Sequence, residues 1–245
     1  MNNNQATLHK IQEMKLLGML RAFKNSLETK HSHDFTPDEL VSHLVDAEFD
    51  DRNNRRIERL LKAAKFRYQA SIEEVNFTLK RNLNKNLLLR LSDCSWIDKH
   101  QNVIFTGPTG VGKSFLASAL GHHACINFFK VGYFSAAKLF PRLKLSKADG
   151  SYPKEINKIS KLDLFILDDF GLDTLDKQSR LSFLEILEDR HGRKSTLVVS
   201  QLPPNSWHDA IGDPTIADAC CDRIIHSSHR IELKGGSLRK LHSVA

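Results

Sequence analysis

The chain has 245 residues and 40% apolar content, enough for one large α/β domain or for one domain with a small appendage. No stretch approaches the roughly 18 apolar residues of a membrane helix, and residues 1–5 lack a secretory apolar core, so we expect a cytoplasmic protein without membrane partners. The net charge of +7 favours an acidic partner such as nucleic acid, although simple solubility charge is the alternative.

Helical periodicity dominates the first 85 residues. Apolar side chains three or four positions apart over residues 8–27 predict one amphipathic helix. A capping box with proline at the first helical position, Thr36-Pro37-Asp38-Glu39, predicts a second helix that extends to Leu61. Another capping sequence at residues 71–74 predicts a shorter helical piece. We therefore expect an all-helical N-terminal domain over residues 1–85 and a second domain over residues 86–245.

A basic cluster lies in the second predicted helix and just after it. Its seven basic residues and single acid, Glu58, leave a net charge of +6 (seven minus one) within residues 52–67. A solvated helix face normally mixes signs, so contact with the phosphate backbone of DNA is the sharper interpretation. An acidic protein partner and plain solvation are the alternatives. The basic residues are Arg52, Arg55, Arg56, Arg59, Lys62, Lys65 and Arg67, and the first six are our candidate DNA or partner contacts.

A complete phosphate-binding loop, G-x-x-x-x-G-K-[ST], begins at Gly107. A β-branched and aromatic run at residues 103–106 predicts a strand before it, and a helix should begin near Lys113. Lys113 can reach the β and γ phosphates, and the Ser114 hydroxyl can hold Mg²⁺. A glycine-rich turn with an accidental lysine is the alternative. The expected ATP-binding residues are Gly107, Pro108, Thr109, Gly110, Val111, Gly112, Lys113, Ser114 and Phe115.

An acid pair, Asp168-Asp169, ends the apolar run of residues 162–167. Such a run is typical of a buried parallel strand, and the carboxyl ends of such strands bind ligands in α/β sheets. One acid can coordinate Mg²⁺, for which we name Asp168 together with Ser114, and the other can orient or deprotonate the attacking water. Taken alone, the pair could also be a solvated strand end or a helix cap.

The rest of the second domain alternates between strand and helix patterns. We predict strands at residues 131–135 and 196–199, helices at 136–144 and 176–191, and a small helical region after Trp207. The second helix should turn Leu181, Leu184, Ile186 and Leu187 inward. This alternation predicts a parallel sheet covered by helices. The four cysteines (Cys94, Cys125, Cys220 and Cys221) lack the spacing of a zinc site or a disulfide framework.

Several segments together resemble the IstB family, the ATP-binding helper proteins of bacterial insertion sequences. This family is similar to the helicase loader DnaC and the initiator DnaA within the AAA+ ATPases. The resemblance implies an AAA+ P-loop domain preceded by a small all-helical domain. The matching segments are residues 107–114, 167–172, 188–190, 200–203, 222–226 and 234–240.

The resemblance also implies roles for three further residues. Ser200 matches sensor 1, a polar contact near the γ-phosphate, and Arg239 matches sensor 2, which contacts nucleotide in its own subunit. Arg223 matches the arginine finger, which reaches the ATP of a neighbouring subunit. The family's acid pair commonly differs from the Asp-Glu of many AAA+ enzymes, as it does here at Asp169, which suits slow hydrolysis.

The expected function is that of an ATP-dependent helper of DNA transposition. The resemblance implies ATP and Mg²⁺ as cofactors, with Lys113, Asp168, Asp169, Ser200 and Arg223 in catalytic roles. It also implies double-stranded DNA and a transposase as partners, and a homo-oligomer with ATP sites between subunits. A DnaC-like helicase loader and a DnaA-like initiator are the alternatives.

Overall fold

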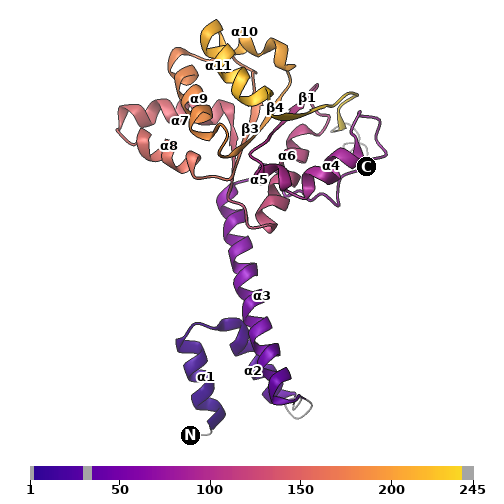
Figure 1. The fold of residues 1–245 in the computed structure, drawn as a ribbon, viewed down its shortest axis with the longest axis vertical. Coiled ribbons are helices and arrows are strands. Elements are labelled where there is room, and N and C mark those ends of the chain that lie inside the picture. The colour runs from indigo at the N-terminus through magenta and orange to yellow at the C-terminus, as the bar shows by residue number, and fades with distance from the viewer. Residues whose placement is uncertain (1–2, 30–34, 239–245) are drawn as a thin grey trace. The chain divides into compact units, whose positions relative to one another are not determined.

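The computed structural model describes residues 3–29 and 35–238. The chain forms two compact units, residues 1–59 and residues 60–245, and helix α3 (Pro37–Ala64) runs through their boundary (Figure 1). The boundary predicted after residue 85 therefore falls inside the second unit. Among the described residues, no helix has the length and apolar character needed to cross a membrane.

The first unit contains α1 (Asn3–Glu13), α2 (Leu17–Glu28) and most of α3. The prediction of a single helix over residues 8–27 is wrong, because the helix is interrupted between α1 and α2. Lys15 has a φ of 58°, and the amides of Lys15 and Leu16 donate to the carbonyls of Gln12 and Ile11. These are the two bonds of a Schellman motif, which ends a helix although the apolar spacing continues.

Helix α3 begins at the predicted capping box. The Thr36 amide donates to the Glu39 carboxylate at 2.8 Å, and the Glu39 amide donates to the Thr36 hydroxyl at 3.4 Å. Within the first unit, α2 packs closely against α3 at Gly18, where a Cβ atom would lie 2.2 Å from the carbonyl oxygen of Ala47. Only glycine permits this approach.

Residues 65–84 form an irregular segment, and the helical piece predicted from residue 71 is wrong. The Ser71 amide does donate to the Glu74 carboxylate at 3.1 Å, and the Val75 amide donates to the Ile72 carbonyl, but only one turn forms. Ala70, Ile72 and Val75 are instead buried in the core of the second unit. Tertiary burial of this segment therefore prevails over its local capping preference.

The second unit is built on a five-stranded parallel sheet with the order β2-β3-β4-β1-β5. The first four strands confirm the sequence prediction. β5 was not predicted, because it is a polar edge strand in which only Ile231 is buried. The strands are β1 (Asn102–Thr106), β2 (Val131–Ser135), β3 (Leu164–Phe170), β4 (Ser195–Ser200) and β5 (Ser228–Glu232).

Helices cover both faces of this sheet (Figure 1). On β1, Val103 and Phe105 face one core and Ile104 faces the other, as the alternation along a strand requires. The first core is shared with α4 (Lys85–Ser92), α5 (Ser95–Asp98) and α6 (Lys113–Ile126). The second is shared with α7 (Ala136–Ala148), α8 (Tyr152–Ser160), α9 (Lys177–Arg190), α10 (Trp207–Ile211) and α11 (Pro214–Ile225). A short 3₁₀ helix, Pro204–Ser206, precedes α10.

Two details of the second unit bear on the sequence prediction. Leu181 of α9 is 45% exposed and does not face the core, while Phe183 of the same helix is fully buried. The four cysteines are unbridged and buried, and burial raises the pKa of the Cys94 and Cys125 thiols to about 12. They therefore serve as packing residues.

Candidate nucleotide-binding site

The phosphate-binding loop connects the end of β1 to the start of α6, as predicted. Gly107 has a φ of +135°, and a Cβ atom there would lie 2.1 Å from the carbonyl oxygen of Leu233. Gly112 caps α6 with a φ of +94°. Both positions require glycine, and the loop places the positive end of the 14-residue helix α6 at the expected phosphate position.

Lys113 lies over this loop. Its Nζ donates to the carbonyl oxygens of Gly107 and Pro108 at 2.6 and 2.8 Å, and the residue is only 7% exposed. The ammonium group is thus held beside the loop, from which it can reach an incoming phosphate.

The acid pair occupies the carboxyl end of β3. Asp168 is fully buried, and its Oδ1 accepts a hydrogen bond from the Ser114 hydroxyl at 3.0 Å. Its Oδ2 accepts from the Tyr133 hydroxyl on the neighbouring strand β2. Burial raises the pKa of Tyr133, and the charge of Asp168 raises it further, so the phenol keeps its proton and remains a donor.

Asp169 adopts an unusual backbone conformation. Its φ is +59°, at an irregularity in the pairing of β3 with β4, and its amide donates to Asp168 Oδ1 at 2.9 Å. Non-glycine residues in this region cost about 1–3 kcal/mol, and such strain is often retained at functional sites. The turn directs the two adjacent carboxylates into one site.

The donor set at this site fits Mg²⁺. A serine hydroxyl and a buried carboxylate lie within hydrogen-bond distance of each other, and Mg²⁺ prefers such oxygen ligands, completed by phosphate oxygens and water. The described part of the chain contains no group of three or more His, Cys, Asp or Glu side chains that could hold a metal ion without a ligand such as a nucleotide. Ser114 and Asp168 are therefore the residues that would hold a nucleotide-bound Mg²⁺.

Arg67, a member of the basic cluster in the sequence, also lies at this site. Its Nη1 lies 2.8 Å from Asp169 Oδ2 and 3.2 Å from Asp168 Oδ2. Burial alone would lower the pKa of Arg67, but the charge of Asp169 and hydrogen bonds to both acids raise it. Its spacing groups Arg67 with the basic cluster, but the predicted helix extends only to Leu61, six residues before it. In the structure α3 ends at Ala64, and Arg67 lies in the segment that follows.

A cavity of about 290 Å³ opens beside the loop and the acid pair. The phosphate loop and the acid pair line it, together with the irregular segment at Tyr68 and Arg81, the end of β4 at Gln201, and Leu238. Arg81 is 5% exposed and donates to the carbonyl oxygens of Val111 and Asn76, and its Nε has no hydrogen-bond partner among the described residues. No motif in the sequence identifies Tyr133 or Arg81 as a site residue.

The three residues assigned through the resemblance have different outcomes. Ser200 is fully buried; its hydroxyl donates to the carbonyl of Phe170 and accepts from the Leu202 amide, while the adjacent Gln201 lines the cavity. Arg223 lies on α11, outside this cavity, and pairs with Glu188 at 2.9 Å. Arg239 lies outside the described residues.

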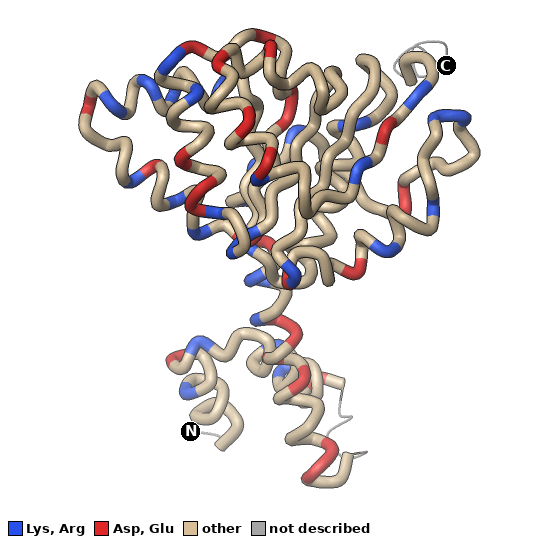
Figure 2. Tube along the Cα trace, turned by 45° about the horizontal axis from the view of Figure 1, so that its top comes forward, with Lys and Arg blue, Asp and Glu red and all other residues tan. Residues whose placement is uncertain are grey.

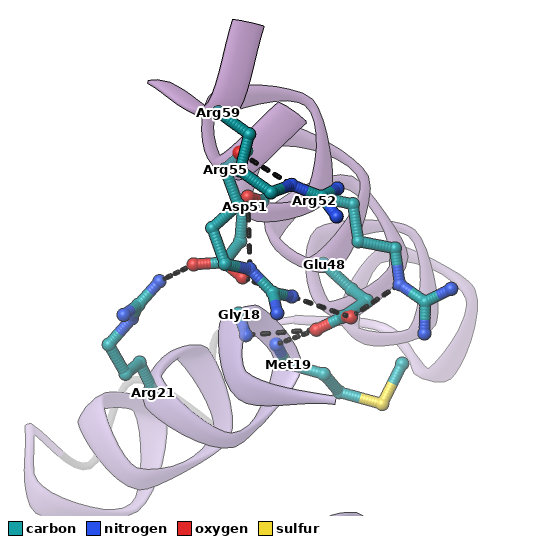
Figure 3. Close-up of polar contacts among 8 residues, drawn as sticks. All are labelled: Gly18, Met19, Arg21, Glu48, Asp51, Arg52, Arg55 and Arg59. Atoms are coloured by element: carbon teal, nitrogen blue, oxygen red, sulfur yellow. Dashed lines mark hydrogen bonds and ion pairs between the residues drawn. The ribbon is translucent and has the colours of Figure 1, made fainter. Parts of the chain in front are cut away.

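The predicted DNA or partner contacts divide between the two units. In the first unit, Arg52 and Arg55 pair with Glu48 and Asp51, acids that lie just before the counted cluster (Figure 3). Lys62 and Lys65 belong to the second unit. Figure 2 shows acidic and basic residues interspersed within each unit. The +6 counted from sequence therefore overstates the charge available to DNA.

A parallel sheet with a phosphate loop after β1 and an acid pair at the end of β3 defines an AAA+ P-loop ATP-binding domain. Solved structures support this fold. The crystal structure of DnaI is similar with a TM-score of 0.57 and 19% identity, over 72% of this chain and 94% of that one. DnaA bound to AMPPCP and single-stranded DNA is similar with a TM-score of 0.56 and 17% identity, over 70% and 52% of the two chains.

Sequence comparison identifies the family. The family described as IstB-like ATP binding protein matches residues 9–245, and the chain belongs to it. It is 43% identical over 234 residues to the insertion sequence ATP-binding protein y4pL of Sinorhizobium fredii, covering 96% of both chains. It is 37% identical over 203 residues to the ATP-binding protein of insertion sequence IS1162 from Pseudomonas fluorescens, covering 82% of this chain and 88% of that protein.

Proposed function

We propose that this protein is an ATPase that assists DNA transposition, assembling on double-stranded DNA with ATP and regulating a partner transposase. The observation that carries the proposal is the buried Asp168 carboxylate bonded to Ser114 beside Lys113, in a chain whose relatives are named insertion sequence ATP-binding proteins. This is the arrangement from which P-loop enzymes bind and hydrolyse ATP.

The side chains of the site have separate roles in the proposed reaction. Lys113 and the loop amides bind the β and γ phosphates, and Ser114 and Asp168 hold Mg²⁺. When bound, Mg²⁺ neutralises charge on the phosphate oxygens. Asp169 accepts a hydrogen bond or a proton from the attacking water, since its side chain is 30% exposed at the cavity while that of Asp168 is fully buried.

We propose that a second copy of the chain completes this site through Arg223. In its own chain this side chain lies outside the cavity, on α11, where it is 25% exposed and paired with the half-exposed Glu188. An exposed pair of this kind contributes little to stability and can open at low cost. A guanidinium from a neighbouring subunit could then stabilise charge that develops on the transferred phosphoryl group.

The first unit carries features that suit a protein partner. Val41, Val45 and Phe49 follow one another at four-residue spacing on α3 and are 61%, 51% and 64% exposed. An exposed apolar stripe on a helix is typical of a surface that packs against another protein. We assign this stripe to the transposase and the basic residues that follow it to DNA, with a replicative helicase as the alternative protein partner.

The proposed chemistry is tested by ATP binding and turnover in two variants. Lys113→Ala removes the cation at the loop and should abolish ATP binding. Asp169→Asn should retain binding and lower hydrolysis about 100-fold, because its role concerns the water. Lys161→Ala and Asp173→Asn, both exposed in the second unit, are the matched controls.

Undiminished turnover in Lys113→Ala would contradict the assigned site. Equal loss of binding and hydrolysis in Asp169→Asn would make Asp169 a structural or metal-binding residue. Turnover of the wild type should rise when DNA and a partner transposase are added. Stimulation by a replicative helicase instead would favour the loader alternative.

A further inference from the structure

Among the described residues that line the nucleotide cavity, Arg67 is the cation outside the phosphate loop that contacts both acids. It lies in the irregular segment after α3, lines the same cavity as Lys113 and Ser114, and places Nη1 within 3.2 Å of both carboxylates. The side chain is 40% exposed, and its guanidinium stacks over Tyr68 with 5.7 Å from Cζ to the ring centroid. The two carboxylates hold the guanidinium by charge, and the side chain also borders the cavity, into which it can move.

The two oxygens of Asp168 face different partners. Oδ1 faces Ser114, where Mg²⁺ would be held, while Oδ2 faces Tyr133 and Arg67. Arg67 supplies the positive charge that two adjacent carboxylates require. If Ser114 and Asp168 hold Mg²⁺, its positive charge would lie beside the same acids and would weaken their attraction for the guanidinium. At the same time, ATP brings a terminal phosphate, an anion that suits the fork of donors of an arginine.

We propose that Arg67 is a phosphate-binding residue that acts within its own chain: it pairs with Asp168 and Asp169, and it transfers to the terminal phosphate when ATP binds with Mg²⁺. This inference rests on the proposed function of the site. It gives the segment before α4 a function of its own, which is to distinguish ATP from ADP. The phosphate loop and the acid pair do not perform this function. ADP lacks the terminal phosphate, so it gives Arg67 no new partner.

The experiment compares ATP and ADP binding by purified Arg67→Ala, Arg67→Lys and wild-type protein, using fluorescent analogues at saturating Mg²⁺. Arg67→Ala should weaken ATP binding about tenfold, the scale of one charge-assisted hydrogen bond, and leave ADP binding unchanged. Arg67→Lys should lose less.

Arg142→Ala is the matched control, because Arg142 is 48% exposed, pairs with Glu155 at 3.4 Å and stacks over Phe134 at 5.4 Å, but does not line the cavity. It should leave the affinities for ATP and ADP unchanged. ATP affinity that is unchanged in Arg67→Ala, or ATP and ADP affinities that fall equally, would overturn the inference. Failure of the proposed function has a different signature, because wild-type protein would then bind ATP without hydrolysing it, whatever residue 67 is.

Discussion

In the first unit, Arg52 and Arg55 lie on the carboxylates of Glu48 and Asp51 along a helix; in the second, Arg67 lies on Asp168 and Asp169 beside the phosphate loop. All three arginines belong to one basic run in the sequence. The difference is in what surrounds the acids. Asp168 and Asp169 lie beside a cavity of about 290 Å³, whereas Glu48 of α3 accepts a hydrogen bond from the Gly18 amide of α2.

Glu48 shows how the first unit uses its charges. Its Oε2 accepts from the amides of Gly18 and Met19, in the first turn of α2, and its Oε1 accepts from Arg52 at 2.7 Å (Figure 3). A carboxylate at a helix N-terminus stabilises the unsatisfied amides there. These charges hold two helices together, whereas the pair of Arg67 with Asp169 in the second unit lines a cavity that a ligand can enter.

The largest effect should come from Arg223, the site residue whose pairing most resembles that of a structural ion pair. Arg223→Ala should bind ATP normally and hydrolyse it about 1,000-fold more slowly, the scale of a lost arginine finger. Mixing it with Lys113→Ala should restore some turnover, because the second chain lends its arginine to the first chain's intact loop. Turnover per subunit should also rise with protein concentration.

Glu188→Ala is the control for this variant, because it breaks the same ion pair and keeps the guanidinium. It should retain turnover. If turnover falls equally in Glu188→Ala and Arg223→Ala and does not recover in the mixture, Arg223 has a structural role like that of the ion pairs in the first unit.

Sequence patterns predicted the phosphate loop, the acid pair and four of the five strands because each depends on residues close together in the chain. The residue types from Gly107 to Ser114 determine the conformation of the loop locally, and the run before Asp168 is apolar enough to identify a buried strand. Arg67, Tyr133 and Arg81 could not be predicted in the same way, because they reach the site through tertiary packing. The break at Lys15 was missed because apolar spacing records which face is buried and does not record backbone continuity.

A smaller effect is expected at Glu48. Glu48→Ala removes a buried carboxylate from two amides and an arginine, and should destabilise the α2–α3 packing by about 1–2 kcal/mol. Hydrogen exchange of the Gly18 and Met19 amides should accelerate accordingly, with no change in ATP affinity of the second unit. Glu58→Ala, on an exposed position of the same helix, should leave both unchanged.

The same contact predicts a pH dependence. Burial would raise the pKa of Glu48, but hydrogen bonds from Arg52, Met19 and Gly18 outweigh it and lower the pKa below 4.5. Because the folded pKa is lower than the unfolded one, the stabilisation is complete above about pH 4.5 and is lost as the pH falls through the folded value. Protection of the Gly18 and Met19 amides should fall over that window in the wild type. In Glu48→Gln this dependence should be absent, and its persistence there would assign the titration to another group.

The smallest effect concerns DNA. If the basic residues contact phosphates, binding should be weakly sequence-selective and should weaken steeply with salt, with a slope that falls by about 0.9 for each contact removed. Arg52 and Arg55 already face Glu48 and Asp51, while Lys62 and Lys65 are exposed on the second unit. Lys62→Gln with Lys65→Gln should therefore flatten the slope by nearly two contacts, and Arg52→Gln with Arg55→Gln by less than one. Titrations of each double variant against a long duplex at several salt concentrations measure the two slopes.

Equal flattening would mean that the acids of the first unit release their arginines to DNA, and that the contrast between the two units disappears on binding. A wild-type slope in both variants would place the DNA surface outside this helix and assign the helix to a protein partner.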